Sequence, residues 1–90
     1  MAVTVKIPTQ LRAVTGGESE TQVEGDTVGE VLEALFARYG DLRDRLYDGG
    51  ELRRFVNVYV AGEDIRFVDG LQTSVSDGSE VTILPAVAGG

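Results

Sequence analysis

The last six residues of the sequence carry its clearest candidate for chemistry; they read Pro85-Ala86-Val87-Ala88-Gly89-Gly90. Glycine has no Cβ, so a Gly-Gly backbone can enter a channel that is too narrow for ordinary side chains. Fully extended, this segment reaches roughly 20 Å and would carry in the Gly90 carboxylate, which is ionised at neutral pH. A carboxylate is a poor electrophile, so we expect another enzyme to activate it, usually as an acyl-adenylate made with ATP. Glycine-ended termini also occur without any function, because chain ends fray by default.

The composition argues against an enzyme that works alone. The 90 residues include neither cysteine nor histidine. The chain therefore lacks a thiolate nucleophile, a disulfide and a thiolate metal site, and it lacks the side chain best suited to proton transfer near neutrality. A chain of this length supports one modest core. We expect a protein co-substrate that binds no cofactor or metal itself.

The charge also limits the partners. Eight basic and 15 acidic residues give a net charge of −7, with Lys6 the single lysine and Arg53-Arg54 the one adjacent basic pair. Nucleic acids need clustered cations, so we expect no nucleic-acid partner. The sequence contains no apolar run of about 20 residues that could span a membrane, and its start does not resemble a secretory signal. We expect a cytoplasmic protein that is monomeric when free and has no membrane partner.

Periodicity predicts the elements of the N-terminal half. Residues 3–7 alternate apolar and polar side chains, which is typical of a half-buried strand, and residues 18–23 suit an edge strand after a loop over 11–17. Thr27-Val28-Gly29-Glu30 is a capping box, and apolar residues then recur at three- and four-residue spacing. A helix is predicted over about 27–39, with Gly40 as its left-handed C-cap.

The C-terminal half predicts a short helical turn at 42–46 and strands at 55–60 and 80–84. One apolar helix stripe needs one sheet face to cover. The sequence therefore predicts an α+β roll, with a mixed four- to five-stranded sheet and the helix packed on one face. The domain spans 1–84, and 85–90 is a flexible C-terminal tail.

Alternation along the last two strands predicts an outer sheet face, on which we expect a partner to dock. Its residues are Phe55, Asn57, Tyr59, Thr82 and Leu84. The alternative is that loops cover part of this face or that its exposure is ordinary. The acidic pairs Glu63-Asp64 and Asp41/Asp44 have no opposing ligands, so we expect solvated carboxylates there and no metal site.

Two stretches connect these features to a known family. The ending Asp77-Gly78-x-Glu80-Val81-x-Ile83-Leu84-Pro85-x-Val87-Ala88-Gly89-Gly90 resembles the signature of the ThiS/MoaD ubiquitin-like sulfur carriers, which have the β-grasp fold. The segments Arg54-Phe55-Val56-Asn57-Val58-Tyr59-Val60 and Glu63-Asp64-Ile65-Arg66-Phe67 resemble the actinobacterial CysO-type members of cysteine biosynthesis. The resemblance covers essentially the whole chain.

The resemblance implies a specific chemistry. A MoeB/ThiF-like enzyme would adenylate the Gly90 carboxylate, and a sulfur donor would convert it to a thiocarboxylate. In CysO-type pathways this sulfur enters cysteine on a PLP-dependent cysteine synthase that uses O-phosphoserine, and a zinc-dependent JAMM-type peptidase releases the product. Such carriers also serve thiolated natural products. Pro85, Ala86, Val87, Ala88 and Gly89 would enter the partner's active site.

Two other functions use the same tail. A ubiquitin-like protein modifier would pass the activated carboxyl to lysines of other proteins. A small subunit like MoaD of molybdopterin synthase would insert its tail into one fixed enzyme. The tail alone does not separate these three functions.

Overall fold

The structure is a computed structural model of the chain and describes residues 2–53 and 56–85. The predicted docking residue Phe55 and the predicted tail residues 86–90, Gly90 included, lie outside the described residues.

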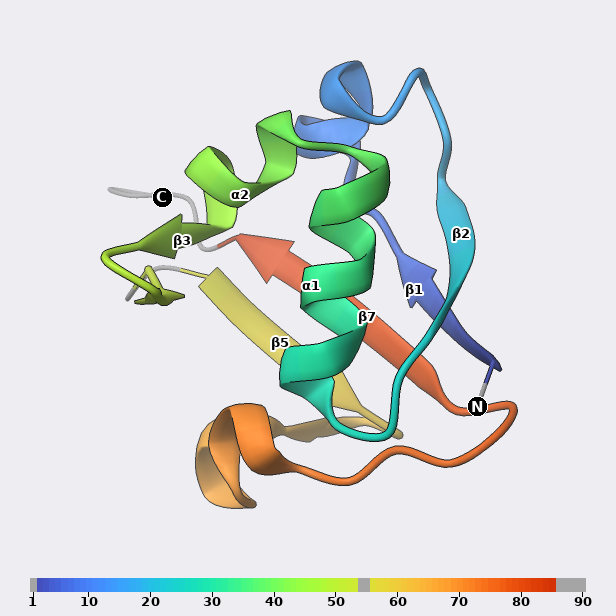
Figure 1. Ribbon diagram of the computed structural model, residues 1–90, viewed down its shortest axis with the longest axis vertical. Coiled ribbons are helices and arrows are strands. Elements are labelled where there is room, and N and C mark those ends of the chain that lie inside the picture. Colours follow the sequence, from blue (N-terminus) through green and yellow to red (C-terminus); the bar gives the residue numbers. More distant parts are fainter. Residues whose placement is uncertain (1, 54–55, 86–90) are drawn as a thin grey trace.

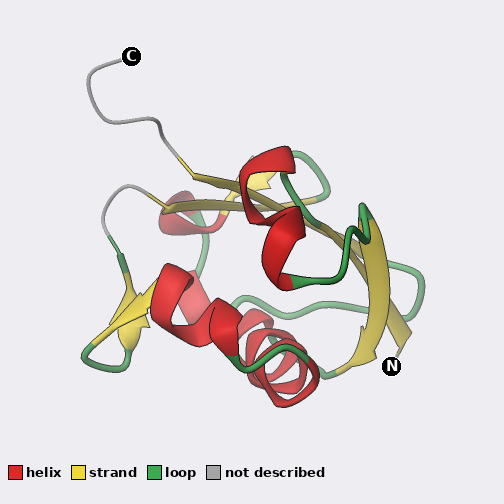
Figure 2. Ribbon diagram, turned by 90° about the horizontal axis from the view of Figure 1, so that it is seen from above, coloured by secondary structure: helices red, strands yellow, loops and turns green. Residues whose placement is uncertain are grey.

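The architecture is a mixed five-stranded sheet with one main helix on one face (Figures 1 and 2). The strands, in the spatial order β2-β1-β7-β5-β6, are β2 (Glu20–Glu24), β1 (Ala2–Lys6), β7 (Glu80–Pro85), β5 (Val56–Val60) and β6 (Glu63–Asp64). β1 and β7 pair in parallel, and the other neighbours pair antiparallel. This arrangement confirms the predicted α+β roll.

The remaining elements connect the strands. They are the helices α1 (Val28–Arg38) and α2 (Asp41–Leu46), the 3₁₀ helices η1 (Thr9–Val14), η2 (Ile65–Phe67) and η3 (Gly70–Gln72), and a separate hairpin of β3 (Tyr47–Asp48) with β4 (Glu51–Leu52). The predicted turn at 42–46 is therefore α2, and η1 overlaps the first part of the loop predicted at 11–17.

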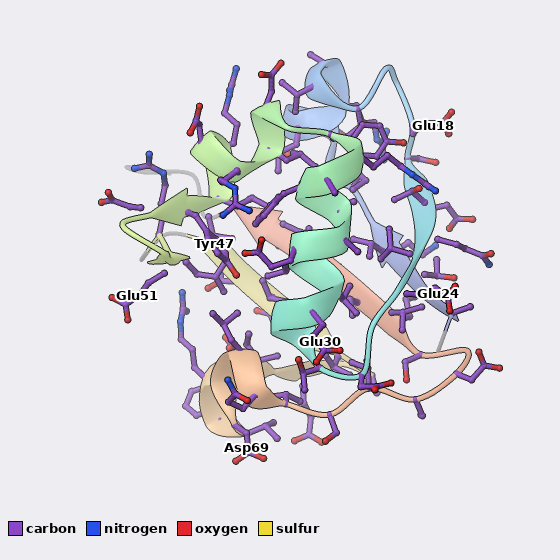
Figure 3. All side chains as sticks on the ribbon, in the orientation of Figure 1. Glu18, Glu24, Glu30, Tyr47, Glu51 and Asp69 are labelled. Carbon is purple, nitrogen blue, oxygen red and sulfur yellow. The ribbon has the colours of Figure 1, made fainter. Side chains whose placement is uncertain are left out.

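Alternation along the strands separates the two faces of the sheet. The side chains that face α1 are almost fully buried: Val3, Val5, Val56, Val58, Val81 and Ile83. The apolar stripe of α1 covers them with Val28, Val31, Leu32, Leu35 and Phe36. Tyr47 completes this side, because its ring packs edge-on against Phe36 with the ring centres 4.8 Å apart (Figure 3). The centre of the core therefore lies between α1 and one face of the sheet, and side chains from the connecting elements, such as Leu11, Leu42, Leu46 and Ile65, extend it.

Local hydrogen bonds set the start of α1, close to the predicted capping box. The Glu30 N–H donates to Thr27 Oγ1 at 3.2 Å. In return the Glu30 carboxylate accepts from the N–H of Asp26 at 2.9 Å, one residue before the position that a capping box predicts. Both bonds satisfy donors at the positive end of the helix dipole, where the Glu30 carboxylate is also favoured.

Two sequence predictions need correction. Gly40 is not a left-handed cap: its φ of −56° and ψ of −33° are right-handed helical, and it serves as the N-cap of α2 because the chain turns directly into that helix. The last strand does not end at Leu84, because Pro85 still pairs with Val56. Proline lacks an N–H, but its carbonyl oxygen remains available for pairing.

Candidate functional site

The candidate site lies where the central strand β7 leaves the sheet. β7 is flanked by β1 and β5. Its last residue, Pro85, sits opposite Val56, the first residue of β5. Whatever follows Pro85 therefore starts from a strand end that is paired with β5, at the end of the sheet toward which both β1 and β7 run (Figure 1).

Four of the five predicted docking residues come together on the open face at this end. Asn57 pairs with Leu84, and Tyr59 pairs with Thr82. Leu84 is 47% exposed, and the other three are half-buried. Directly opposite side chains in an antiparallel pair lie about 5 Å apart, so these four form one continuous patch. We call Asn57, Tyr59, Thr82 and Leu84 the open-face patch.

Arg66 supports one edge of this patch. Its guanidinium donates to Asn57 Oδ1 at 2.6 Å and to the backbone oxygen of Val56 at 2.7 Å. Asp64 accepts from the N–H of Arg66 at 2.9 Å and holds the start of η2. The Asn57 side chain is therefore fixed by a charged hydrogen bond, which orders a polar group beside exposed Leu84.

Lys6 borders the patch on the other side. It is level with Thr82 in the parallel pairing of β1 and β7. Its ammonium lies 3.0 Å from a Glu20 oxygen and 3.9 Å from a Glu80 oxygen. The hydrogen bond to Glu20, together with the charges of Glu20 and Glu80, raises the pKa of Lys6 above its ordinary value of 10.5. An open hollow of about 320 Å³ separates Leu84 from the segment that runs from Lys6 to Arg12.

This arrangement provides a surface that can serve recognition. The described ranges hold no cluster of three or more possible metal-ligating side chains. In the same ranges, no helix is both long and apolar enough to cross a bilayer. The geometry can present an ordered surface of mixed polarity and deliver the chain that follows Pro85 from a fixed point.

Sequence reasoning missed Arg66 and Lys6 as neighbours of the patch. Alternation indicated that Lys6 points away from Val5 and Ile7. The parallel register that sets it beside Thr82 depends on the tertiary fold, which no local pattern encodes.

The comparisons with known proteins agree with this fold. The family model described as "ThiS family" matches residues 5–90. The "Sulfur carrier protein CysO" of Mycobacterium tuberculosis is 54% identical over 93 residues, which covers 100% of both chains. The "Small archaeal modifier protein 3" of Haloferax volcanii is 42% identical over 81 residues, which covers 88% of each.

The fold of the chain is also similar to that of a solved structure. The chain superimposes on a chain of the crystal structure of the Amycolatopsis orientalis BexX/CysO complex with a TM-score of 0.92 at 50% identity, covering 98% of this chain and 99% of that one. The predicted β-grasp fold is thereby confirmed.

Proposed function

The chain belongs to the ThiS family, and from this premise we propose that it is a sulfur carrier protein whose reactive group is the Gly90 carboxylate. The observation that carries the proposal is the 54% identity to a sulfur carrier protein over the full length of both chains. The absence of cysteine and histidine supports it too, because the chemistry must then be supplied by partners.

The proposed steps balance as follows. A Gly90 carboxylate oxygen attacks the α-phosphate of ATP on a MoeB/ThiF-like enzyme, pyrophosphate leaves, and an acyl-adenylate forms. Sulfide or the terminal sulfur of a persulfide then attacks the acyl carbon, and AMP leaves with the electron pair of the broken C–O bond. With a persulfide, the product is an acyl disulfide, and a thiol must then cleave its S–S bond, which leaves the thiocarboxylate and a new disulfide. The final product is a thiocarboxylate. Residues 85–89 carry this group into the partner's active site, since Gly89 and the small neighbouring side chains fit a narrow channel.

The open-face patch is the surface that we assign to the activating enzyme. It lies at the sheet end from which the tail departs, so one partner can hold the body and the tail together. Phe55 extends the predicted surface along the chain but lies outside the described residues. The net charge of −7 would favour encounter with a basic partner surface.

The proposed acceptor is a PLP-dependent cysteine synthase that uses O-phosphoserine, followed by a zinc-dependent JAMM-type peptidase. Synthases of thiolated natural products are further proposed acceptors. The Amycolatopsis orientalis relative was crystallised in a complex with another protein, BexX, which supports a carrier that binds partner proteins. ATP, PLP and zinc would belong to these partners and not to this chain. All of these enzymes would act in the cytoplasm, and the carrier would be monomeric between encounters.

A protein-modifier function is the second candidate, because a relative 42% identical bears the name "Small archaeal modifier protein 3". Both functions begin with the same adenylate and differ in what attacks it: a sulfur for the carrier, a lysine amine of another protein for the modifier.

Intact mass spectrometry separates the two. The chain is incubated with its activating enzyme, ATP and a sulfur source. A carrier gains the mass difference of sulfur for oxygen, and alkylation with iodoacetamide marks the new thiocarboxylate. A modifier instead gives conjugates of higher mass that survive thiol reductant. Lysine-linked conjugates without any thiocarboxylate would overturn the carrier function.

A further inference from the structure

An activated C-terminus is at risk from the chain's own amines. An acyl-adenylate or any related acyl donor reacts with a neutral amine to form an amide, and that reaction would remove the carboxyl group for good. Seven of the eight basic side chains are arginines. A guanidinium stays protonated and is no competitor for the acyl group. Lys6 is the one side-chain amine.

The number of residues after Pro85 is large enough for the chain to extend from Pro85 to Lys6. Lys6 is level with Thr82, and about 10 Å of strand separates Thr82 from Pro85. Five residues follow Pro85 and can span about 17 Å. The Gly90 carbonyl can therefore return to the Nζ of Lys6 in the same molecule.

An α-amino group does not share this position. The N–H of Gly78 donates to the oxygen of Ala2, so the start of β1 is level with Gly78. About 23 Å of strand separates Gly78 from Pro85, which exceeds the reach of the tail. Because β1 and β7 are parallel, Ala2 lies at the opposite end of the sheet from Pro85.

Two carboxylates from different strands hold Lys6. Glu20 on β2 and Glu80 on β7 flank it on the open face, at 3.0 and 3.9 Å. The lysine side chain is 45% exposed, so it is accessible and its reactivity is governed by its charge. A protonated ammonium has no lone pair and cannot attack a carbonyl.

We propose that Glu20 and Glu80 hold Lys6 as an unreactive ammonium, and so prevent the chain from acylating itself when its C-terminus is activated. The biological value of this protection rests on the proposed carrier function. The reaction that is blocked is attack of the Nζ lone pair on the Gly90 carbonyl carbon, loss of the leaving group with its bonding electrons, and release of an ammonium proton to water. The raised pKa of Lys6 is in the direction that this protection requires.

The test uses a chemically prepared acyl donor, so it does not depend on any activating enzyme. The chain is made with a mercaptoethanesulfonate thioester at Gly90 and incubated at about pH 8.5, where a small fraction of lysine is neutral. Intact mass distinguishes the hydrolysed acid from the internal amide, which is lighter by one water. Peptide mapping locates the amide.

We expect Glu20→Gln/Glu80→Gln to form the internal amide about two- to fivefold faster than the wild type, a range set by the modest strength of exposed ion pairs. Adding Lys6→Arg should abolish the amide. The control Glu51→Gln/Asp69→Asn removes the same charge at exposed positions of other elements and should match the wild type (Figure 3). Circular dichroism checks the fold, and Glu20→Gln alone serves if the double variant is unfolded.

Three results would overturn the proposal. The first is equal amide formation in wild type and Glu20→Gln/Glu80→Gln. The second is an amide that persists after Lys6→Arg. The third is hydrolysis alone in every variant, since Lys6 would then be unable to reach Gly90 and would need no protection. None of these results bears on whether Gly90 is adenylated.

Discussion

The two faces of the sheet are made from alternate residues of the same strands, yet they are built differently. On β7, Val81 and Ile83 are fully buried under α1, whereas Thr82 is half-buried and Leu84 is 47% exposed. The covered face holds mainly apolar side chains, with Thr21 at its β2 edge, and its order comes from close packing. The open face holds a leucine among polar groups, and its order comes from charged hydrogen bonds such as that from Arg66 to Asn57.

The difference shows how 90 residues can be both stable and recognisable. A chain of this size has one core, and the sheet contributes to that core through its covered face. The open face contributes less to stability. Its side chains can therefore be suited to partner binding without a large loss of stability. A substitution on the covered face should therefore alter stability, and a substitution of the adjacent residue, on the open face, should alter partner binding.

Adjacent substitutions on β7 test this contrast with the largest expected effect. Ile83→Asp places a charge in the core and should cost more than about 4 kcal/mol of unfolding free energy. Leu84→Asp should change it by less than about 0.5 kcal/mol and slow adenylation about tenfold, as expected for a contact at the centre of an interface. Urea denaturation measures the first quantity, and pyrophosphate release with the activating enzyme measures the second. Equal destabilisation by both variants would refute the division between the faces.

The close approach of the β2–α1 connection to α1 can be tested with two glycines, one at the contact and one as a control. A Cβ at Gly25 would lie 2.8 Å from the backbone nitrogen of Val31, and backbone cannot move aside easily. Gly25→Ala should therefore cost about 2 kcal/mol. A Cβ at Gly40 would meet nothing closer than 4.0 Å, and Gly40 is already right-handed helical.

Gly40→Ala is thus the matched control and should change stability by less than about 0.5 kcal/mol. Thermal and urea unfolding of the two variants give the comparison. If Gly25→Ala were as stable as the wild type, the close approach of the β2–α1 connection to α1 would not be required.

The smallest expected effects are in alkaline solution, where one group on each face titrates. Burial, with a further contribution from the charge of Glu33, raises the pKa of Tyr47 above its ordinary value of 10.0. As the pH rises, Tyr47 loses its proton in the unfolded chain before it does so in the folded chain. The contribution of Tyr47 to the free energy of unfolding is therefore fully present below pH 10.0 and is lost as the pH rises through the folded-state pKa. Tyr47→Phe should reduce this alkaline loss.

The pH dependence linked to Lys6 on the open face has the same direction. Its stabilisation is fully present below pH 10.5 and is lost as the pH rises through the raised pKa of Lys6. Its cause is ion pairing in solvent and not burial, so added salt should weaken the Lys6 effect and leave that of Tyr47. Unfolding curves recorded from pH 8 to 11 on Tyr47→Phe and Lys6→Arg, at about 0.1 and 1 M salt, measure both. Identical salt responses would show that the two faces are not electrostatically distinct.

Local patterns were enough to predict most of the fold. Alternation located β1, β5 and β7, and helical spacing with the Thr27 cap located α1, because both periodicities follow from backbone geometry. Gly40 was predicted wrongly, since a glycine after an apolar stripe also suits a direct entry into a second helix. The pairing of Thr27 with Ser74 and the hairpin of β3 with β4 depend on contacts that no short window contains.

The candidate site was predictable in part, because side chains alternate between the two faces along each strand. Alternation was sufficient to group Tyr59 with Thr82 and Asn57 with Leu84 once two adjacent strands were assumed. It could not reveal that Arg66 reaches back to Asn57, because a side-chain rotamer selects that contact. It also could not place Glu20 and Glu80 on either side of Lys6, since strand order decides which charges meet.

The central claim is that Gly90 carries the reactive group, and its removal is the most direct test. Wild type and a variant that lacks only Gly90 are incubated with the activating enzyme, ATP and sulfide, and their intact masses are compared. The account predicts a sulfur-for-oxygen mass gain in the wild type and none in the variant, with both proteins folded. The same mass gain in both would contradict it, because the modification would then not require the Gly90 carboxylate.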